Sequence, residues 1–248
     1  MIYSVKDAAR WNDTDATRCV RPSQLLIYMQ ETACRHMNSG GQDLDALRDE
    51  KNLAFIVTRL TLELYRPLHA LEEYTCSTWI SEGKGLNFPR FFRIVNGQGE
   101  KVVEGASQWG LFALATHLPL RAGAFRYATT PEEPLPFATP RRFCVPEVMT
   151  QVGVRRVVYS DIDYNGHMNN TRYPDMVCDF LPEQALPHIR TMHFDFVREA
   201  RYGAELRVLR GERKTETGTA YLIRTLNEAD EICLEAEVLT QAASERIE

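Results

Sequence analysis

The sequence predicts an α+β fold in which one unit of strand, helix and antiparallel strands occurs twice in tandem. Two observations predict it: each half has a single stretch with helical spacing of apolar residues, and four strand-like runs follow each stretch. Of the 248 residues, 44% are hydrophobic and 25% are charged, which is the composition of a folded globular protein. A sheet that wraps one helix in each half satisfies this order of elements.

The first half is expected to begin with a strand over residues 4–11 and a turn-like stretch over residues 12–17. A helix follows, closed by Gly40-Gly41 as its C-cap, and its apolar residues recur at helical spacing. After a charged connector, Asn96-Gly97 supplies hairpin chemistry between two predicted strands. The apolar helix residues are Leu25, Leu26, Met29, Ala33 and Met37, and the four strands are expected at residues 54–65, 74–80, 88–95 and 101–113.

The second half repeats this order. A strand over residues 152–159 precedes a turn-like loop at 161–167, and a helix is expected over residues 170–180, ended by Pro182. Four further strands are expected at residues 190–198, 205–210, 220–226 and 231–240.

The repeat is also visible in the letters of the sequence. Asp13-Thr14-Asp15 corresponds to Asp161-Ile162-Asp163, and residues 62–66 correspond to residues 194–198. We interpret the chain as an internal duplication, and two unrelated α+β domains with accidental similarity are the alternative.

Prolines gather between the two halves, where no helical or strand period is sustained. Such a run cannot supply the hydrogen bonds of a sheet and is typical of an extended linker. We therefore expect an N-terminal domain over residues 1–118, a linker over residues 119–150 and a C-terminal domain over residues 151–248. The prolines are Pro119, Pro131, Pro134, Pro136, Pro140 and Pro146.

Composition excludes several classes of protein. A net charge of −5 gives no support to nucleic-acid binding. No apolar stretch approaches the roughly 18 residues of a membrane span, and the first residues lack the pattern of a signal peptide, so a cytoplasmic protein is expected. The six cysteines are scattered without a C-x-x-C pair, which predicts free thiols and no metal site.

The halves differ in one polar loop. After Asp163 the second half has Asn165 and His167, where the first half has Thr17 and Cys19. An amide donor, an imidazole and a carboxylate before a helix N-terminus suit attack on a carbonyl. A helix-capping turn is the alternative, with Asn169 or Asn170 as N-cap, Asp163 in an Asx-turn and His167 partly in the core.

A second difference between the halves, and a second part of the candidate site, lies at Arg198-Glu199, where the first half has Arg66-Pro67. Strict alternation from Phe194 and Phe196 puts Arg198 on their face and Glu199 on the other. A bulge or the end of the strand could turn Glu199 toward His167, and a solvated edge glutamate is the alternative.

These residues resemble those of a known family. The run from Ser160 to Tyr173, with its D-x-N-x-H-x-N-N string, and the strand ending in Arg198-Glu199 resemble the acyl-ACP thioesterases of plants and bacteria. Residues 30–33, 52–59, 77–79 and 106–109 of the first half are similar to that family as well.

The resemblance implies a double hotdog fold, two tandem sheets each wrapped around a central helix. It implies hydrolysis of fatty acyl thioesters of acyl carrier protein (ACP) in fatty acid biosynthesis, without a cofactor or metal. The family's active-site residues correspond to Asp163, Asn165, His167 and Glu199. Glu199 and His167 would activate water, Asn165 and the helix N-terminal amides would hold the carbonyl oxygen, and Asp163 would position Asn165 or His167. The acyl chain would lie in the first half.

The chain also departs from the family. Plant members often have a cysteine directly after the glutamate, where this chain has Ala200, and the plastid-targeting extension is absent. Direct attack by Glu199, an acyl-CoA thioesterase and a non-catalytic acyl-binding module remain alternatives. ACP is acidic, so a basic docking patch is expected; Arg141-Arg142, Arg155-Arg156 and Arg213-Lys214 are the candidates. Acyl-chain preference, substrate-binding residues and homodimerisation are left open.

Overall fold

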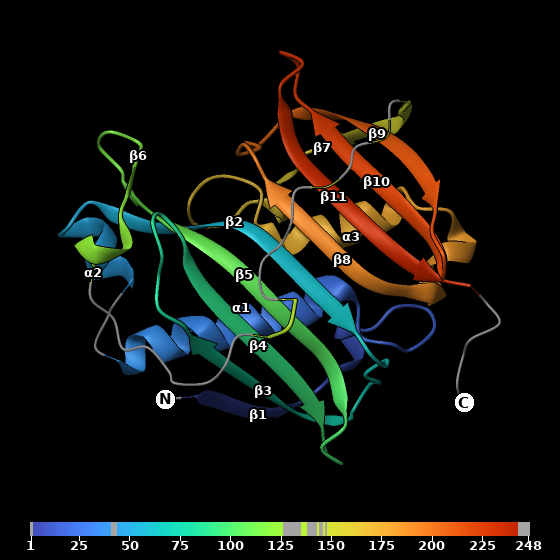
Figure 1. Ribbon diagram of the computed structural model, residues 1–248, viewed down its shortest axis with the longest axis horizontal. Coiled ribbons are helices and arrows are strands. Elements are labelled where there is room, and N and C mark those ends of the chain that lie inside the picture. The colour runs from blue at the N-terminus through green and yellow to red at the C-terminus, as the bar shows by residue number, and fades with distance from the viewer. Residues whose placement is uncertain are drawn as a thin grey trace. The chain divides into compact units, whose positions relative to one another are not determined.

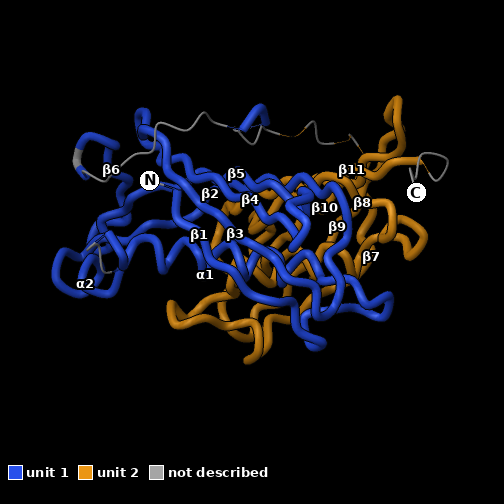
Figure 2. The backbone as a smooth tube through the Cα atoms, turned by 90° about the horizontal axis from the view of Figure 1, so that it is seen from below, with its two compact units in different colours: residues 1–140 blue, residues 141–248 orange. Residues whose placement is uncertain are grey.

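The computed structural model describes residues 2–40, 44–125, 135–137, 143, 146 and 148–242. The chain divides into two compact units, unit 1 at residues 1–140 and unit 2 at residues 141–248 (Figure 2). Each unit consists of an antiparallel sheet and a helix that packs on it (Figure 1).

The sheet of unit 1 has the strand order β1-β3-β4-β5-β2, and every neighbouring pair is antiparallel. The short strand β6 adds to the end of β5. The predicted strands are therefore confirmed, although the first ends at Ala8 because Trp11 begins a 3-10 turn, Trp11–Asp13. The strands are β1 (Tyr3–Ala8), β2 (Leu53–Leu64), β3 (Glu73–Ile80), β4 (Phe88–Asn96), β5 (Lys101–Ala113) and β6 (Leu118–Leu120).

Helix α1 (Pro22–Ser39) lies across this sheet, with its predicted apolar stripe toward the strands. Four of the five predicted residues are buried, and only Met37 is half-buried. A Cβ atom built on Gly105 of β5 would lie 3.1 Å from the Met29 sulfur, so glycine lets helix and sheet approach closely. The helix starts earlier than predicted because Pro22 is favoured in its first turn.

A second helix, α2 (Leu44–Asp49), occupies the charged connector, where no helix was predicted. Only Leu47 among its residues is buried, in contact with Phe88 and Leu111. The six residues of α2 are too few to show a helical period of apolar residues, which is why the sequence pattern missed this helix.

The sheet of unit 2 has the order β8-β11-β10-β9-β7. Counted by position within each half, this is the strand order of unit 1, which confirms the predicted duplication. The strands are β7 (Thr150–Arg156), β8 (Ile189–Phe196), β9 (Glu205–Lys214), β10 (Gly218–Leu226) and β11 (Ile232–Gln241).

The helix of unit 2 is shorter than predicted. A 3-10 turn, Asn170–Arg172, leads into α3 (Tyr173–Asp179), and a further 3-10 stretch, Glu183–His188, precedes β8. The Tyr173 ring packs edge-on against Phe196 of β8, with centroids 5.5 Å apart. None of the helices in the described ranges is long and apolar enough to cross a membrane.

Part of the segment expected to be an extended linker packs on unit 1. Leu135 is 5% exposed and lies with Trp79, Phe91 and Ala106, and Phe137 packs against the same cluster. These residues of the segment therefore bury apolar surface instead of running free through solvent.

Candidate active site

The polar loop of unit 2 is a tight turn closed by its own backbone. The Asp163 N–H donates to the His167 carbonyl at 3.1 Å, and the Gly166 N–H donates to the Asp163 carbonyl at 3.0 Å. Gly166 has φ 86°, a left-handed conformation that glycine adopts without steric cost. The Asp163 Oδ1 accepts the Asn165 N–H at 2.8 Å. This is the Asx-turn of the capping alternative, so the carboxylate of Asp163 fixes the turn.

A buried ion pair anchors the start of this turn. Asp161 is 5% exposed, and its carboxylate accepts two hydrogen bonds from Arg155 Nη2, at 2.7 and 2.8 Å. The same carboxylate accepts the Val158 N–H at 2.8 Å. Sequence reasoning noticed Asp161 only as part of the repeat; its match to Asp13, which is also buried, was the signal of a structural role.

Backbone pairing brings Glu199 to the turn. Strand β8 ends at Phe196, so the alternation expected for residues 198 and 199 does not extend to them. The Met168 N–H donates to the Ala200 carbonyl at 2.8 Å, and His167 and Arg201 form an isolated β-bridge. As a result, His167 Nε2 lies 3.4 Å from Glu199 Oε1.

The four predicted site residues therefore come together within unit 2. His167 Nδ1 lies 4.0 Å from Asp163 Oδ1, on the opposite side of the ring from Glu199. The Asn165 side-chain amide donates to Asp163 Oδ2 at 3.4 Å. The side chain of Glu199 is 51% exposed and that of His167 is 26% exposed, so water reaches both. An imidazole between two carboxylates can pass a proton from water to an acid.

The helix-capping alternative is correct for Asn169, one of the two residues expected as N-cap. The Asn169 Oδ1 accepts the Thr171 N–H at 2.9 Å, and the Asn169 carbonyl accepts the Arg172 N–H at 2.9 Å. Because these amides already have acceptors, they are poorly placed to bind a substrate carbonyl oxygen. The side-chain amide of Asn165 is the better candidate for that role.

The described cysteines take no part in this arrangement. Burial raises the pKa of Cys233, and it raises the pKa of Cys76 to about 12, which keeps both thiols protonated. Ala200, directly after Glu199, is 2% exposed. All five described cysteines are free, as predicted, and Cys144 lies outside the described residues. No group of three or more potential metal ligands occurs within the part of the chain that the structure describes.

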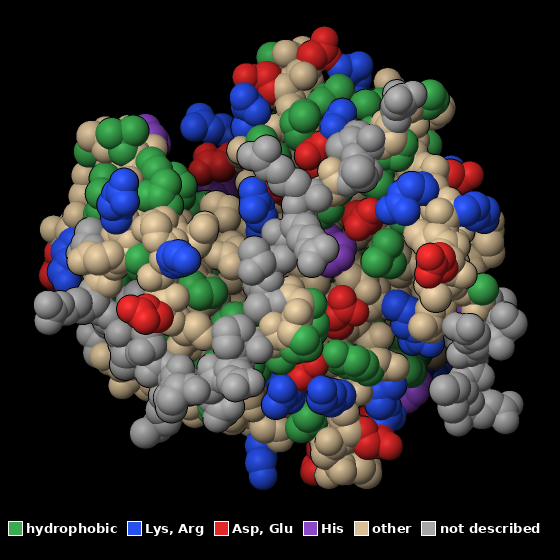
Figure 3. All heavy atoms as spheres, viewed as in Figure 1, with side chains coloured by type: hydrophobic (Ala, Val, Ile, Leu, Met, Phe, Trp, Pro, Cys, Tyr) green, Lys and Arg blue, Asp and Glu red, His purple; other side chains and the backbone are tan. Residues whose placement is uncertain are grey.

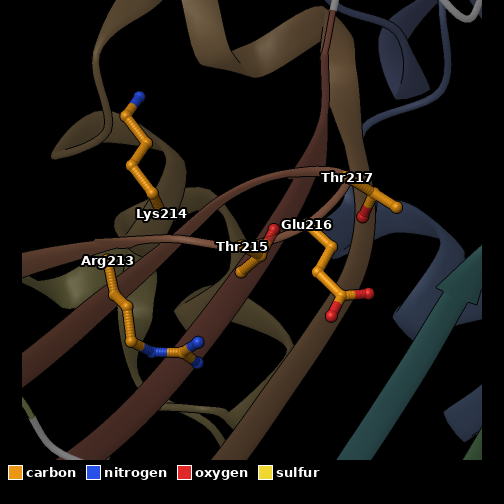
Figure 4. Close-up of a pocket in the computed structure, with 5 residues that line it drawn as sticks. All are labelled: Arg213, Lys214, Thr215, Glu216 and Thr217. Atoms are coloured by element: carbon orange, nitrogen blue, oxygen red, sulfur yellow. The ribbon is translucent and has the colours of Figure 1, made fainter.

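A separate pocket lies at the hairpin between β9 and β10 (Figure 4). Arg213 in this pocket donates to Glu237 at 3.3 Å, and the Lys214 ammonium donates to Thr219 Oγ1 at 3.1 Å. None of the four predicted site residues lines it. Its lining residues are Arg213, Lys214, Thr215, Glu216 and Thr217.

Known folds match the chain over nearly its whole length. An acyl-ACP thioesterase from Bacteroides thetaiotaomicron superposes with a TM-score of 0.85 at 23% identity, covering 97% of this chain and 98% of that one. A putative oleoyl thioesterase from Lactobacillus plantarum gives 0.81 at 19%, covering 98% and 96%. The 12:0-ACP thioesterase of Umbellularia californica gives 0.74 at 17%, covering 96% of each chain. These similarities show the fold, two hotdog units.

Two family models identify the chain. Residues 2–121 match the acyl-ACP thioesterase N-terminal domain, and residues 148–241 match the acyl-ACP thioesterase C-terminal domain. No curated protein matches the sequence. Together the two models cover most of the chain, in order, which shows that it belongs to the acyl-ACP thioesterase family and is a thioester hydrolase.

Proposed function

We propose that the protein releases free fatty acid from acyl-ACP and that Glu199, His167, Asn165 and Asp163 perform the reaction. The observation that supports this is the 3.4 Å contact between His167 Nε2 and Glu199 Oε1 at a solvent-accessible turn. A water held by these two groups loses a proton to them as it attacks the thioester carbonyl. The oxyanion then accepts a hydrogen bond from the Asn165 amide, and the proton goes to the departing thiolate of the phosphopantetheine arm.

Replacing the proposed base tests the assignment. We expect Glu199→Gln and His167→Ala each to lower kcat for acyl-ACP roughly 10² to 10⁴-fold, because a positioned proton acceptor contributes about that much. The measurement is release of free acid from ACP thioesters of increasing chain length. Glu216→Gln, an exposed change on the β9–β10 hairpin, is the matched control and should keep the wild-type rate. Near-normal turnover by Glu199→Gln would contradict the proposal.

Isotope labelling distinguishes attack by water from direct attack by Glu199. If Glu199 attacks the carbonyl directly, a transient anhydride forms, and its hydrolysis can leave solvent oxygen in the Glu199 carboxylate. A single turnover in ¹⁸O-water should therefore leave Glu199 unlabelled if water attacks the thioester.

The free-acid assay also distinguishes the rival functions. A much higher kcat/KM with acyl-CoA than with acyl-ACP would identify an acyl-CoA thioesterase. Binding of acyl chains without release of acid would identify a non-catalytic module.

The acyl chain, in our proposal, binds to the N-terminal domain over residues 1–118. Beside α2, several apolar side chains are only partly buried around the core of Leu47, Phe88 and Leu111. Apolar surface of this kind is what a hydrocarbon chain would cover. The partly buried residues of this domain include Leu53, Phe55 and Trp109.

Trimming this cluster should change the preferred chain length. Phe55→Ala removes an aromatic ring and leaves more space beside this cluster, so we expect the kcat/KM optimum to move toward longer acyl chains, with little change for the shortest ones. Val148→Ala, at a residue 77% exposed in unit 2, is the control. An unchanged chain-length profile for Phe55→Ala would place the acyl chain elsewhere.

A further inference from the structure

The turns of the two units have the same backbone. The Asp15 and Asp163 N–H groups donate to the carbonyls of Cys19 and His167, at 2.9 and 3.1 Å. The segment after the second strand of each unit pairs with this turn through the same backbone hydrogen bond. The Val20 N–H donates to the Leu68 carbonyl at 2.8 Å, as Met168 does to Ala200. Residues at matched positions can therefore be compared as if one were a substitution of the other.

Three exposed positions around this turn differ sharply between the units. Tyr164, Arg201 and Tyr202 of unit 2 stand where unit 1 has Ala16, His69 and Ala70. We call the three residues of unit 2 the rim. Tyr164 is 74% exposed and Tyr202 is 67% exposed. The unit 1 turn folds without these aromatic rings, so folding does not require them at these positions.

Arg201, which was not among the predicted docking candidates, differs from two of the arginines that were. Arg155 forms an ion pair with Asp161, and Arg213 forms one with Glu237. Arg201 is exposed, and its guanidinium forms no ion pair with any described residue. The backbone of Arg201 forms a β-bridge with that of His167, so the Arg201 charge lies near the proposed pair of His167 and Glu199.

We propose that the rim of Tyr164, Arg201 and Tyr202 is the surface on which the acidic carrier protein docks while its phosphopantetheine arm presents the thioester. This inference rests on the proposed function. Tyrosine and arginine are the residues that most often anchor protein interfaces, where they combine apolar area with hydrogen-bonding groups. A cation that lacks an internal partner complements the carboxylates of such a carrier.

The rim fits a protein partner better than a small ligand. Small ligands bind in concave pockets, whereas these tyrosines stand out into solvent. On the face seen in Figure 3, basic and acidic side chains are interspersed, so a broad positive patch does not mark a rival docking surface there. The docking candidates Arg141-Arg142 lie outside the described residues.

The test replaces the rim by the residues that the same backbone holds in unit 1. The rim variant is Tyr164→Ala/Arg201→His/Tyr202→Ala, and Arg213→Gln/Lys214→Gln on the hairpin is the control. Each is assayed with the acyl-ACP that the wild type hydrolyses fastest and with the pantetheine thioester of the same acid. Binding of holo-ACP is measured separately by fluorescence anisotropy.

We expect the rim variant to lose at least tenfold more kcat/KM on acyl-ACP than on acyl-pantetheine, and to bind holo-ACP at least tenfold more weakly. The wild type should also lose affinity for holo-ACP as salt increases, and the rim variant less so. The hairpin variant should stay within twofold of the wild type in both assays.

Several results would overturn docking at the rim. Equal losses on the two substrates would show that the rim serves the chemistry, and a loss confined to the hairpin variant would place docking there. Tyr202→Ala alone, expected to lose about threefold on acyl-ACP, tests the inference if the triple variant does not fold. If the wild type hydrolyses no thioester but the rim variant still weakens holo-ACP binding, docking stands and the proposed function fails.

Discussion

The turn of unit 1 and the turn of unit 2 share a backbone and differ in chemistry. In unit 2, His167 meets the Glu199 carboxylate at 3.4 Å, whereas in unit 1 the Cys19 sulfur lies 3.8 Å from His69 Nδ1. Pro67 stands where Glu199 would be and has no acid to offer. In place of Asn165, Thr17 donates its hydroxyl to Asp15 at 2.6 Å.

The comparison separates what folding needs from what the reaction needs. The two aspartates of each turn are kept in both units, because each carboxylate accepts backbone N–H groups that the turn would otherwise leave unpaired. The amide, the imidazole and the glutamate are present in only one unit. Residues that differ on an unchanged backbone are the ones to test for catalysis.

Exchanging these side chains should have the largest effect. We expect Asn165→Thr/His167→Cys to lower kcat for acyl-ACP at least 10³-fold, since it removes the proposed proton acceptor and the proposed oxyanion donor together. The midpoint of denaturant unfolding should change little, because unit 1 holds threonine and cysteine on the same backbone. Residual activity within tenfold of wild type would mean that the difference between the turns is not the catalytic difference.

Sequence patterns predicted the fold better than the site geometry. The helical spacing of Leu25, Met29 and Ala33 predicted α1 because burial itself is periodic on a helix. The four site residues were assigned by resemblance and by the difference between the halves. No pattern could place Glu199, because it lies beyond the end of β8 and its position depends on the backbone pairing of Met168 with Ala200.

Acid should weaken both units, for reasons that differ between them. Burial, assisted by the nearby Arg90 charge, lowers the pKa of His36 in unit 1 to about 4, and burial alone lowers the pKa of His193 in unit 2 to about 4. Between pH 6.5 and 4 the unfolded chain binds protons that the folded chain does not. Stability therefore falls as pH decreases through this window, by about 2–3 kcal/mol for the more deeply buried His193 and by less for the half-buried His36.

Three variants test this difference between the units. His36→Gln and His193→Gln should each remove part of the pH dependence of the unfolding free energy, measured by urea titration from pH 7 to pH 4. Arg90→Met should reduce the part that belongs to His36 and leave the part that belongs to His193. A wild-type stability that stays constant across this range would show that neither imidazole is held neutral by burial.

The smallest effect concerns the left-handed residues that follow the second strand of each unit. Gly203 has φ 85° and its counterpart Leu71 has φ 65°, so the same backbone uses glycine in one unit and a bulky residue in the other. A Cβ on Gly203 would meet no atom within 4 Å, which leaves conformational strain as the only cost of adding it. We expect Gly203→Ala to lower the unfolding free energy by about 1 kcal/mol.

Leu71→Gly in unit 1 should raise the unfolding free energy by less than about 1 kcal/mol, because the relief of strain is partly offset by the greater chain entropy of glycine in the unfolded state. Leu71 is 63% exposed, so little burial is lost. If Leu71→Gly destabilised the protein as much as Gly203→Ala does, contacts of the leucine side chain would outweigh the backbone strain at this position.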